Sequence, residues 1–154
     1  METKTALHGD TMAKLQLLVR INIDSEKGLE EASHAVQDNL VATMFVELGR
    51  DRANNAIELR KYIEWNGEKA IDKGSCAASL HRAWLGVCSV VNGSDSHAIL
   101  CEVERGEDAI KAAYEDALVA TAGSAMNDVL TRQYSIVKAG HDRVREMRDQ
   151  LAVH

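Results

Sequence analysis

Apolar side chains recur at alternating three- and four-residue steps along most of the chain, which is the spacing of one face of an α-helix. A first stretch begins after residue 9, and a second covers residues 40–65. The stripe of the first consists of Leu15, Leu18, Asn22, Ser25, Leu29, Ala32 and Val36. The stripe of the second consists of Val41, Met44, Phe45, Leu48, Asp51, Asn55, Leu59 and Tyr62. The pattern predicts two long helices joined by a short turn at residues 37–39.

The second half of the chain repeats this arrangement after residue 95. The third stripe is Ile99, Val103, Gly106, Ile110, Ala113 and Ala117. The fourth is Met126, Leu130, Gln133, Val137, Gly140, Val144, Met147 and Leu151. A turn at residues 122–124 separates them, and a shorter helix is expected over residues 75–91. No strand-like alternation bounded by turn residues occurs, so the sequence predicts an all-α protein.

Side chains that favour helix ends fit these boundaries. Asp10 or Thr11 is expected to cap the first helix, and Asp38 or Asn39 the second. Gly67 is expected to end the second helix in a left-handed conformation.

The lengths of the connections predict the topology. Short turns make the first and last helix pairs antiparallel hairpins, whereas the long middle connection allows the third main helix to run parallel to the second. We therefore expect a ferritin-like four-helix bundle of two antiparallel hairpins, with a short helix in the long crossover. The alternative is a simple up-and-down bundle with an extra helix packed outside. Residues 1–154 are expected to form one domain, with residues 1–9 as a polar tail.

A pair of motifs occurs twice and predicts that the two hairpins are a repeat. The first copy is Glu26-Lys27-Gly28 followed by Gly49-Arg50-Asp51-Arg52. The second copy is Glu104-Arg105-Gly106 followed by Gly140-His141-Asp142-Arg143. In each copy the two glycines should lie opposite one another near mid-bundle. Because glycine in a helix costs up to about 1 kcal/mol relative to alanine, we expect close packing there.

Composition narrows the partners and the compartment. The chain has a net charge of −6, with basic residues interleaved among acids, which argues against nucleic acid or an anionic membrane surface as a partner. No apolar run is long enough to span a bilayer, and no signal peptide is recognisable. The odd number of cysteines, three, indicates free thiols. We expect a cytoplasmic protein that forms a homo-oligomer, with a dimer as the default.

Several segments together resemble a known family. They are residues 21–28, residues 81–84, residues 97–108, residues 132–134 and residues 141–143. Their combination is similar to a bacterial ferritin-like four-helix-bundle family known as domain-of-unknown-function family 2383. The resemblance covers residues 15–151 and implies a ferritin-like bundle. It implies no activity and no functional residues.

Acidic and polar residues gather near the middle of the predicted bundle, where a ferritin-like protein would hold two metal ions. Such a centre takes a Glu from each of two helices and a Glu-x-x-His from each of the other two. Here Glu31 and His34 form that motif at the end of a helix, and elsewhere Arg50 or Lys138 occupies a position where a ligand is expected. We therefore expect a structural polar layer of salt bridges, with the carboxylates paired to basic residues. The expected partners are Arg50, Arg52, Arg105, Arg143 and Lys138.

Two functions from different classes remain open. The favoured one is a non-catalytic helical bundle with a structural, stress-associated or interaction role and no favoured cofactor. The alternative is a ferritin-like protein that binds iron or manganese at a degenerate mid-bundle site. The ligands expected under that alternative are Glu26, Asp51, Glu107 and His141. A pocket for a small apolar ligand is a third, weaker option.

Overall fold

Four long helices make up the part of the chain that the computed structural model describes, residues 1–73 and 96–152. Helix α1 spans Gly9–Ala35, α2 spans Asn39–Trp65, α4 spans Ser96–Ala120 and α5 spans Asn127–Ala152. The fold is an all-α four-helix bundle, which confirms the fold class predicted from the apolar stripes. The short helix expected over residues 75–91 lies outside the described residues.

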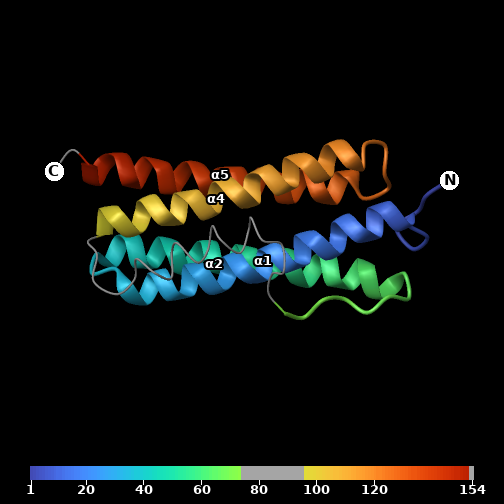
Figure 1. Ribbon diagram of the computed structural model, residues 1–154, viewed down its shortest axis with the longest axis horizontal. Helices are drawn as coiled ribbons and strands as arrows, with labels where there is room; N and C mark the ends of the chain where they lie inside the picture. Colours follow the sequence, from blue (N-terminus) through green and yellow to red (C-terminus); the bar gives the residue numbers. More distant parts are fainter. Residues whose placement is uncertain (74–95, 153–154) are drawn as a thin grey trace.

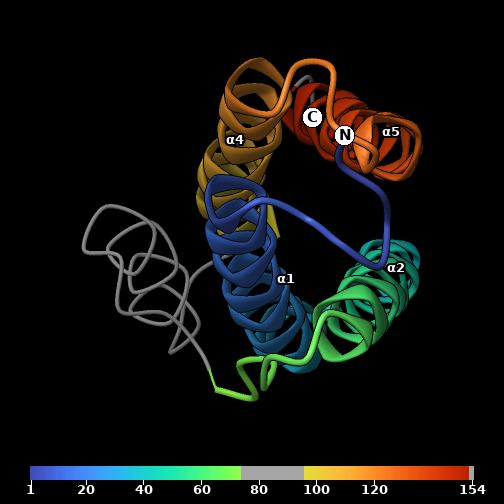
Figure 2. The ribbon, with the colours of Figure 1, turned by 90° about the vertical axis from the view of Figure 1, so that its right-hand side faces the viewer.

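The helices form two antiparallel hairpins that pack side by side (Figure 1). In the end-on view they occupy the corners of a quadrilateral, with α2 and α4 at opposite corners (Figure 2). Helices α1 and α4 are the closer contact between the hairpins, and α2 and α5 the looser one. Helix α4 begins at the end of the bundle where α2 begins, so α2 and α4 run in the same direction (Figure 1). The long-crossover topology is confirmed, and the simple up-and-down alternative is wrong.

The capping residues predicted from the sequence are confirmed for α2 and are wrong for α1. The Asp38 side chain accepts hydrogen bonds from the backbone N–H groups of Leu40 and Val41, so Asp38 is the predicted cap. Gly67 has a φ of 83°, as expected for a left-handed residue after a helix. Helix α1, however, begins at Gly9 without a side-chain cap from its own N-cap residue. The prediction of Asp10 or Thr11 as its cap is wrong.

The reason is that Glu2 in the N-terminal tail folds back onto the start of α1. Its carboxylate accepts hydrogen bonds from the backbone N–H of His8 and the hydroxyl of Thr11, at 2.9 and 2.8 Å. The same carboxylate accepts from the hydroxyl of Ser124 and the N–H of Ala125, at 2.5 and 2.9 Å. One acidic side chain thus ties the tail both to the start of α1 and to the turn between α4 and α5.

Two apolar clusters fill the bundle, one towards each end. The cluster near the α4–α5 turn includes Met12, Ile63 and Met126, and the cluster near the α1–α2 turn includes Ala32 and Val41. Buried polar side chains lie between them. They include Asn22, Ser25, Arg52, Asn55, Glu104, Glu107, Gln133 and His141. The predicted polar layer is therefore present at mid-bundle.

Two positions of the predicted α2 stripe are displaced by one residue, from Asp51 to Arg52 and from Tyr62 to Ile63. Arg52 is fully buried, whereas Asp51 is only partly buried at the boundary of the core. The next inward-facing residue after Leu48 is Arg52, four positions along the chain. The sequence pattern placed it three positions along, at Asp51. The placement of Asp51 inside the bundle was wrong because a buried arginine is acceptable only with a buried partner, and periodicity cannot show that partner.

No helix within residues 1–73 or 96–152 combines the length and apolarity that crossing a bilayer requires.

Candidate functional site

An ion pair between Arg52 on α2 and Glu107 on α4 lies at the centre of the bundle. The Arg52 Nη2 and Glu107 Oε2 atoms lie 2.5 Å apart, and both side chains are 0% exposed. Because these helices occupy opposite corners of the bundle, the pair crosses the interior. Gly140 on α5 allows this crossing, since a Cβ atom there would lie 3.0 Å from Arg52 Nη2 and 2.8 Å from Leu48 Cδ2.

Several polar atoms of this layer have no hydrogen-bond partner within the described part of the chain. They are Nε and Nη1 of Arg52, Oε1 of Glu107, Oγ of Ser25, Oδ1 of Asn22 and Nδ2 of Asn55. Buried polar groups of this kind are the usual partners of internal water molecules. The layer is therefore polar and hydrogen-bonding in character.

A chain of hydrogen bonds beside the ion pair joins all four helices. Asn22 Nδ2 on α1 donates to the hydroxyl of Tyr114 on α4 at 2.9 Å, and that hydroxyl donates to Gln133 Oε1 on α5 at 2.7 Å. Gln133 Nε2 then donates to Glu58 Oε1 on α2 at 2.7 Å. Burial raises the pKa of Tyr114 above its ordinary value. The Tyr114 side chain therefore acts here as a neutral hydrogen-bonding group.

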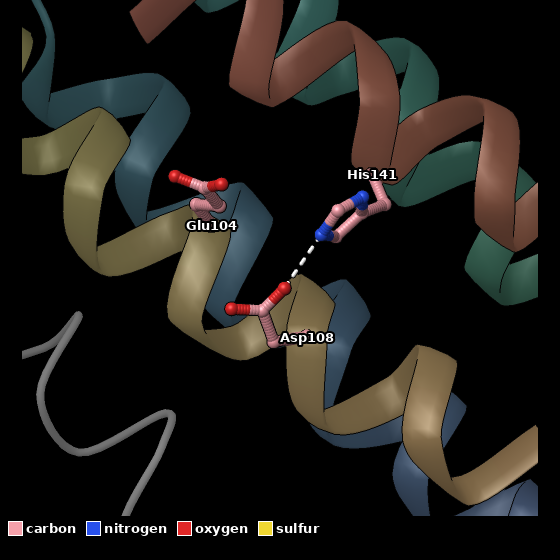
Figure 3. A group of neighbouring side chains, drawn as sticks. All are labelled: Glu104, Asp108 and His141. Carbon is pink, nitrogen blue, oxygen red and sulfur yellow. Dashed lines mark hydrogen bonds and ion pairs between the residues drawn. The ribbon is translucent and has the colours of Figure 1, made fainter.

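A second cluster lies between α4 and α5, and its residues Glu104, Asp108 and His141 define what we call the α4–α5 groove. Glu104 and Asp108 project from α4 toward His141 on α5 (Figure 3). One donor atom from each of the three residues lies within 4.8 Å of the others. Glu104 and His141 are buried, with 8% and 5% of their surface exposed, whereas Asp108 is exposed. The cluster therefore opens to solvent only on the Asp108 side.

The imidazole of His141 is held between two carboxylates. Its Nε2 lies 2.5 Å from Asp108 Oδ1, and its Nδ1 lies 3.1 Å from Asp142 Oδ1. The hydrogen bond with His141 lowers the pKa of Asp142, and the nearby charges of Lys138 and Arg145 lower it further. The lowered pKa favours an ionised Asp142, which accepts a hydrogen bond from Nδ1. The Nε2 nitrogen faces the Asp108 carboxylate on the opposite side of the ring.

Glu104 has a different partner at present. Its Oε2 accepts a hydrogen bond from Nη1 of Arg148, which is also paired with Asp149 at 2.9 Å. Arg148 lies two turns beyond His141 on α5 and was not among the predicted partners of the acidic residues. Within the described residues, four of the five predicted basic residues pair with a carboxylate. Arg52 pairs with Glu107 in the centre, and three pairs lie nearer the surface: Arg143 with Glu47 at 3.0 Å, Arg105 with Glu102 at 3.2 Å and Lys138 with Asp142 at 3.6 Å.

The residues predicted as metal ligands lie in different places. Glu26 lines a groove of about 350 Å³ between α1 and α2, together with Glu30, Gly49 and Arg50. Asp51 lines a groove between α2 and α5. Glu107 points into the centre and His141 lies in the α4–α5 groove, so the four are spread over the bundle.

A di-metal centre of the ferritin type does not fit the described residues. The guanidinium of Arg52 occupies the interior where bridging carboxylates would be needed, and its positive charge opposes a second cation there. The Glu-x-x-His pair of Glu31 and His34 is exposed near the end of α1. The structure thus supports the expected salt-bridged layer at the centre.

Sequence reasoning missed Asp108 and the proximity of Glu104 to His141. The two acids are four residues apart and so share one face of α4, which was a usable signal. Asp108 lies off the apolar stripe, so periodicity did not single it out. Only the pairing of α4 with α5 brings His141 to their level.

Comparison with known families decides where the chain belongs. The family described as Domain of unknown function (DUF2383) matches residues 10–120, which is most of the chain and includes α1, α2 and α4. The chain belongs to this DUF2383 family. No curated protein matches it significantly. Helix α5 and its His141 lie beyond the matched residues of the DUF2383 family, so family membership alone assigns no role to the α4–α5 groove.

Proposed function

We propose that this DUF2383 protein is a non-catalytic helical bundle with a structural, stress-associated or interaction role in the cytoplasm. The observation that carries the proposal is the fully buried pair of Arg52 and Glu107. It fills the position where a ferritin-like bundle would perform metal chemistry. A buried ion pair fixes the register of the helices around it, even where it adds little net stability.

The experiment that tests this proposal compares metal content and stability in the wild type and in Glu107→Gln. If the pair is structural, the variant unfolds at a lower temperature, while iron, manganese and zinc per chain stay unchanged. A matched control is Glu47→Gln, because Glu47 forms an exposed pair with Arg143. A fall in metal content confined to Glu107→Gln would show that the centre holds a metal, and the proposal would be wrong.

An interaction role implies a partner, and a second copy of the chain is the default. Exposed apolar side chains on α2, Val46 at 49% and Ile57 at 63%, offer a surface for such a contact. Light scattering over a dilution series tests it. A mass of 16.9 kDa at every concentration would remove the homo-oligomer.

Metal binding is the second candidate function, and one observation favours it. The donor atoms of Glu104, Asp108 and His141 lie close enough to share one ion. Iron or manganese would then be held in the α4–α5 groove and not at the bundle centre. Elemental analysis of protein purified without chelators tests this function. Iron, manganese and zinc all well below one ion per chain would reject it.

A further inference from the structure

We propose that Glu104, Asp108 and His141 form a mononuclear site for a divalent first-row transition metal ion, with Asp142 orienting the imidazole. The inference rests on the second candidate function and specifies its ligands. Two observations support the inference. Donor atoms from α4 and α5 converge, and a hydrogen bond with Asp142 orients the His141 ring from its other nitrogen.

The first argument is the choice of donors. Two carboxylates and one imidazole without a thiolate suit manganese, iron, cobalt or zinc in the divalent state and do not suit soft ions such as Cu(I). Three protein ligands leave further positions for water. Asp108 is on the exposed side, with 62% of its side chain accessible, so those positions face solvent.

The second argument is the orientation of His141. A metal-bound histidine usually donates its other ring N–H to a carboxylate, which fixes the tautomer and the direction of the ring. Asp142 Oδ1 lies 3.1 Å from Nδ1, while Nε2 points at Asp108 from the buried side of the groove. Only 6% of the His141 side chain is exposed, so packing also fixes the direction of its ring.

The third argument comes from the matching groove of the other hairpin. Under the predicted repeat, Glu26, Glu30 and Arg50 occupy the positions of Glu104, Asp108 and His141. All three of the former line the groove between α1 and α2. A permanent cation, Arg50, therefore stands in the first copy where the second has a histidine. We infer that positive charge belongs at this position and that in the second copy a metal ion supplies it.

Binding has two consequences for the neighbouring groups. The ion takes the place of the direct contact between Nε2 of His141 and Asp108 Oδ1. Glu104 becomes a ligand when Arg148 leaves its carboxylate, and Arg148 keeps its exposed partner Asp149.

The test uses the full chain, stripped of metal with a chelator and titrated with Co²⁺ and Mn²⁺. We expect one Co²⁺ per chain, with a visible absorption band, and selective broadening of the His141 ring signals by Mn²⁺. Each of His141→Gln, Asp108→Asn and Glu104→Gln is expected to lower the affinity about tenfold or more, since outer-shell changes alone have effects of that size. If a substitution at a buried residue prevents folding, Asp108→Asn still tests the proposal, because Asp108 is exposed.

Matched controls lie in the other groove: His34→Gln and Glu30→Gln change an exposed histidine and an exposed acid there. Both are expected to leave Co²⁺ affinity unchanged. The proposal is overturned if the stripped wild type takes up well under one Co²⁺ per chain, or if Asp108→Asn binds as tightly as the wild type.

The two proposals about metal fail in different ways. Native protein without metal that still binds Co²⁺ through His141 would reject the cellular function and keep the site. If the native protein contains metal and both His141→Gln and Asp108→Asn retain it, the metal-binding function stands and the proposed site is wrong.

Discussion

Arg52 and Glu107 form an ion pair across the middle of the bundle, with Nη2 and Oε2 at 2.5 Å and neither side chain exposed to solvent. The pair separates the two apolar clusters, so the charged middle predicted from the sequence is an internal layer. It also decides which residues of α2 and α4 face inward, because each charge needs the other in the low dielectric of the core.

Removal of one member of this pair should be far more damaging than removal of both. We expect Arg52→Met or Glu107→Leu alone to lower the free energy of unfolding by about 3–5 kcal/mol, because each leaves an uncompensated buried charge. The double variant should recover most of that loss. Urea unfolding of the four proteins in a double-mutant cycle measures it, and strictly additive losses would contradict a buried pair.

The hydrogen bonds of Tyr114 should contribute measurably to stability. Tyr114→Phe leaves the buried oxygen of Gln133 without its donor, and we expect a loss of about 1–3 kcal/mol in the free energy of unfolding. Tyr134→Phe is the matched control, because its hydroxyl bonds an exposed carboxylate, Glu115. Chemical unfolding checks both, and equal losses would argue against the internal network.

The two glycines of the motif on α2 and α5 should respond in opposite directions to alanine. At Gly140 a methyl group meets Leu48 and Arg52, which is held by its ion pair, so Gly140→Ala should destabilise by roughly 1–2 kcal/mol. At Gly49 the nearest atoms, Leu29 Cβ and Glu26 O, are 3.7 and 4.0 Å away. Gly49→Ala should therefore gain up to about 1 kcal/mol of helix propensity. Thermal unfolding compares them, and stabilisation by both would show that α5 does not pack closely at Gly140.

Glu2 should make stability depend on pH in the acid range. Burial raises the pKa of Glu2, but hydrogen bonds from Ser124, His8, Thr11 and Ala125 outweigh it and lower the value from 4.5 to about 2. Because the pKa is lower in the folded state, the stabilisation is complete above the unfolded value and is lost as pH falls from 4.5 toward 2.

Glu2→Gln should weaken this pH dependence and lower stability at neutral pH by about 1–2 kcal/mol. The exposed Glu68→Gln should follow the wild type at every pH. Melting curves across the acid range give the comparison. A parallel fall of wild type and Glu2→Gln would mean that Glu2 is not the group that titrates.

The core polar residues could be found from the sequence where they interrupt an apolar stripe. Asn22, Asn55 and Gln133 lie at stripe positions and are buried. Arg52 could not be found in this way, because its position competes with Asp51 one residue earlier and either fits a helical period. Its burial depends on Glu107, which is 55 residues away in the sequence.

The candidate metal ligands were even harder to predict, because the sequence does not show which residues of different helices meet. His141 was predicted from its place in a repeated motif, and it does lie among acids. Asp108 is exposed and off the stripe, and Glu26 and Asp51 share the acidic character of ligands but face other grooves. Residue type and spacing within one helix cannot distinguish these cases, because the missing quantity is the rotation of one helix against the next.

The sequence by itself determined four long helices, their turns and a polar middle, because helix periodicity and capping depend on neighbours within a few residues. Tertiary structure alone decided which charged side chains meet: Arg52 with Glu107 in the centre, and His141 with Asp108 in the groove. Those pairings depend on the relative rotation and level of separate helices, which the packing of the whole bundle sets.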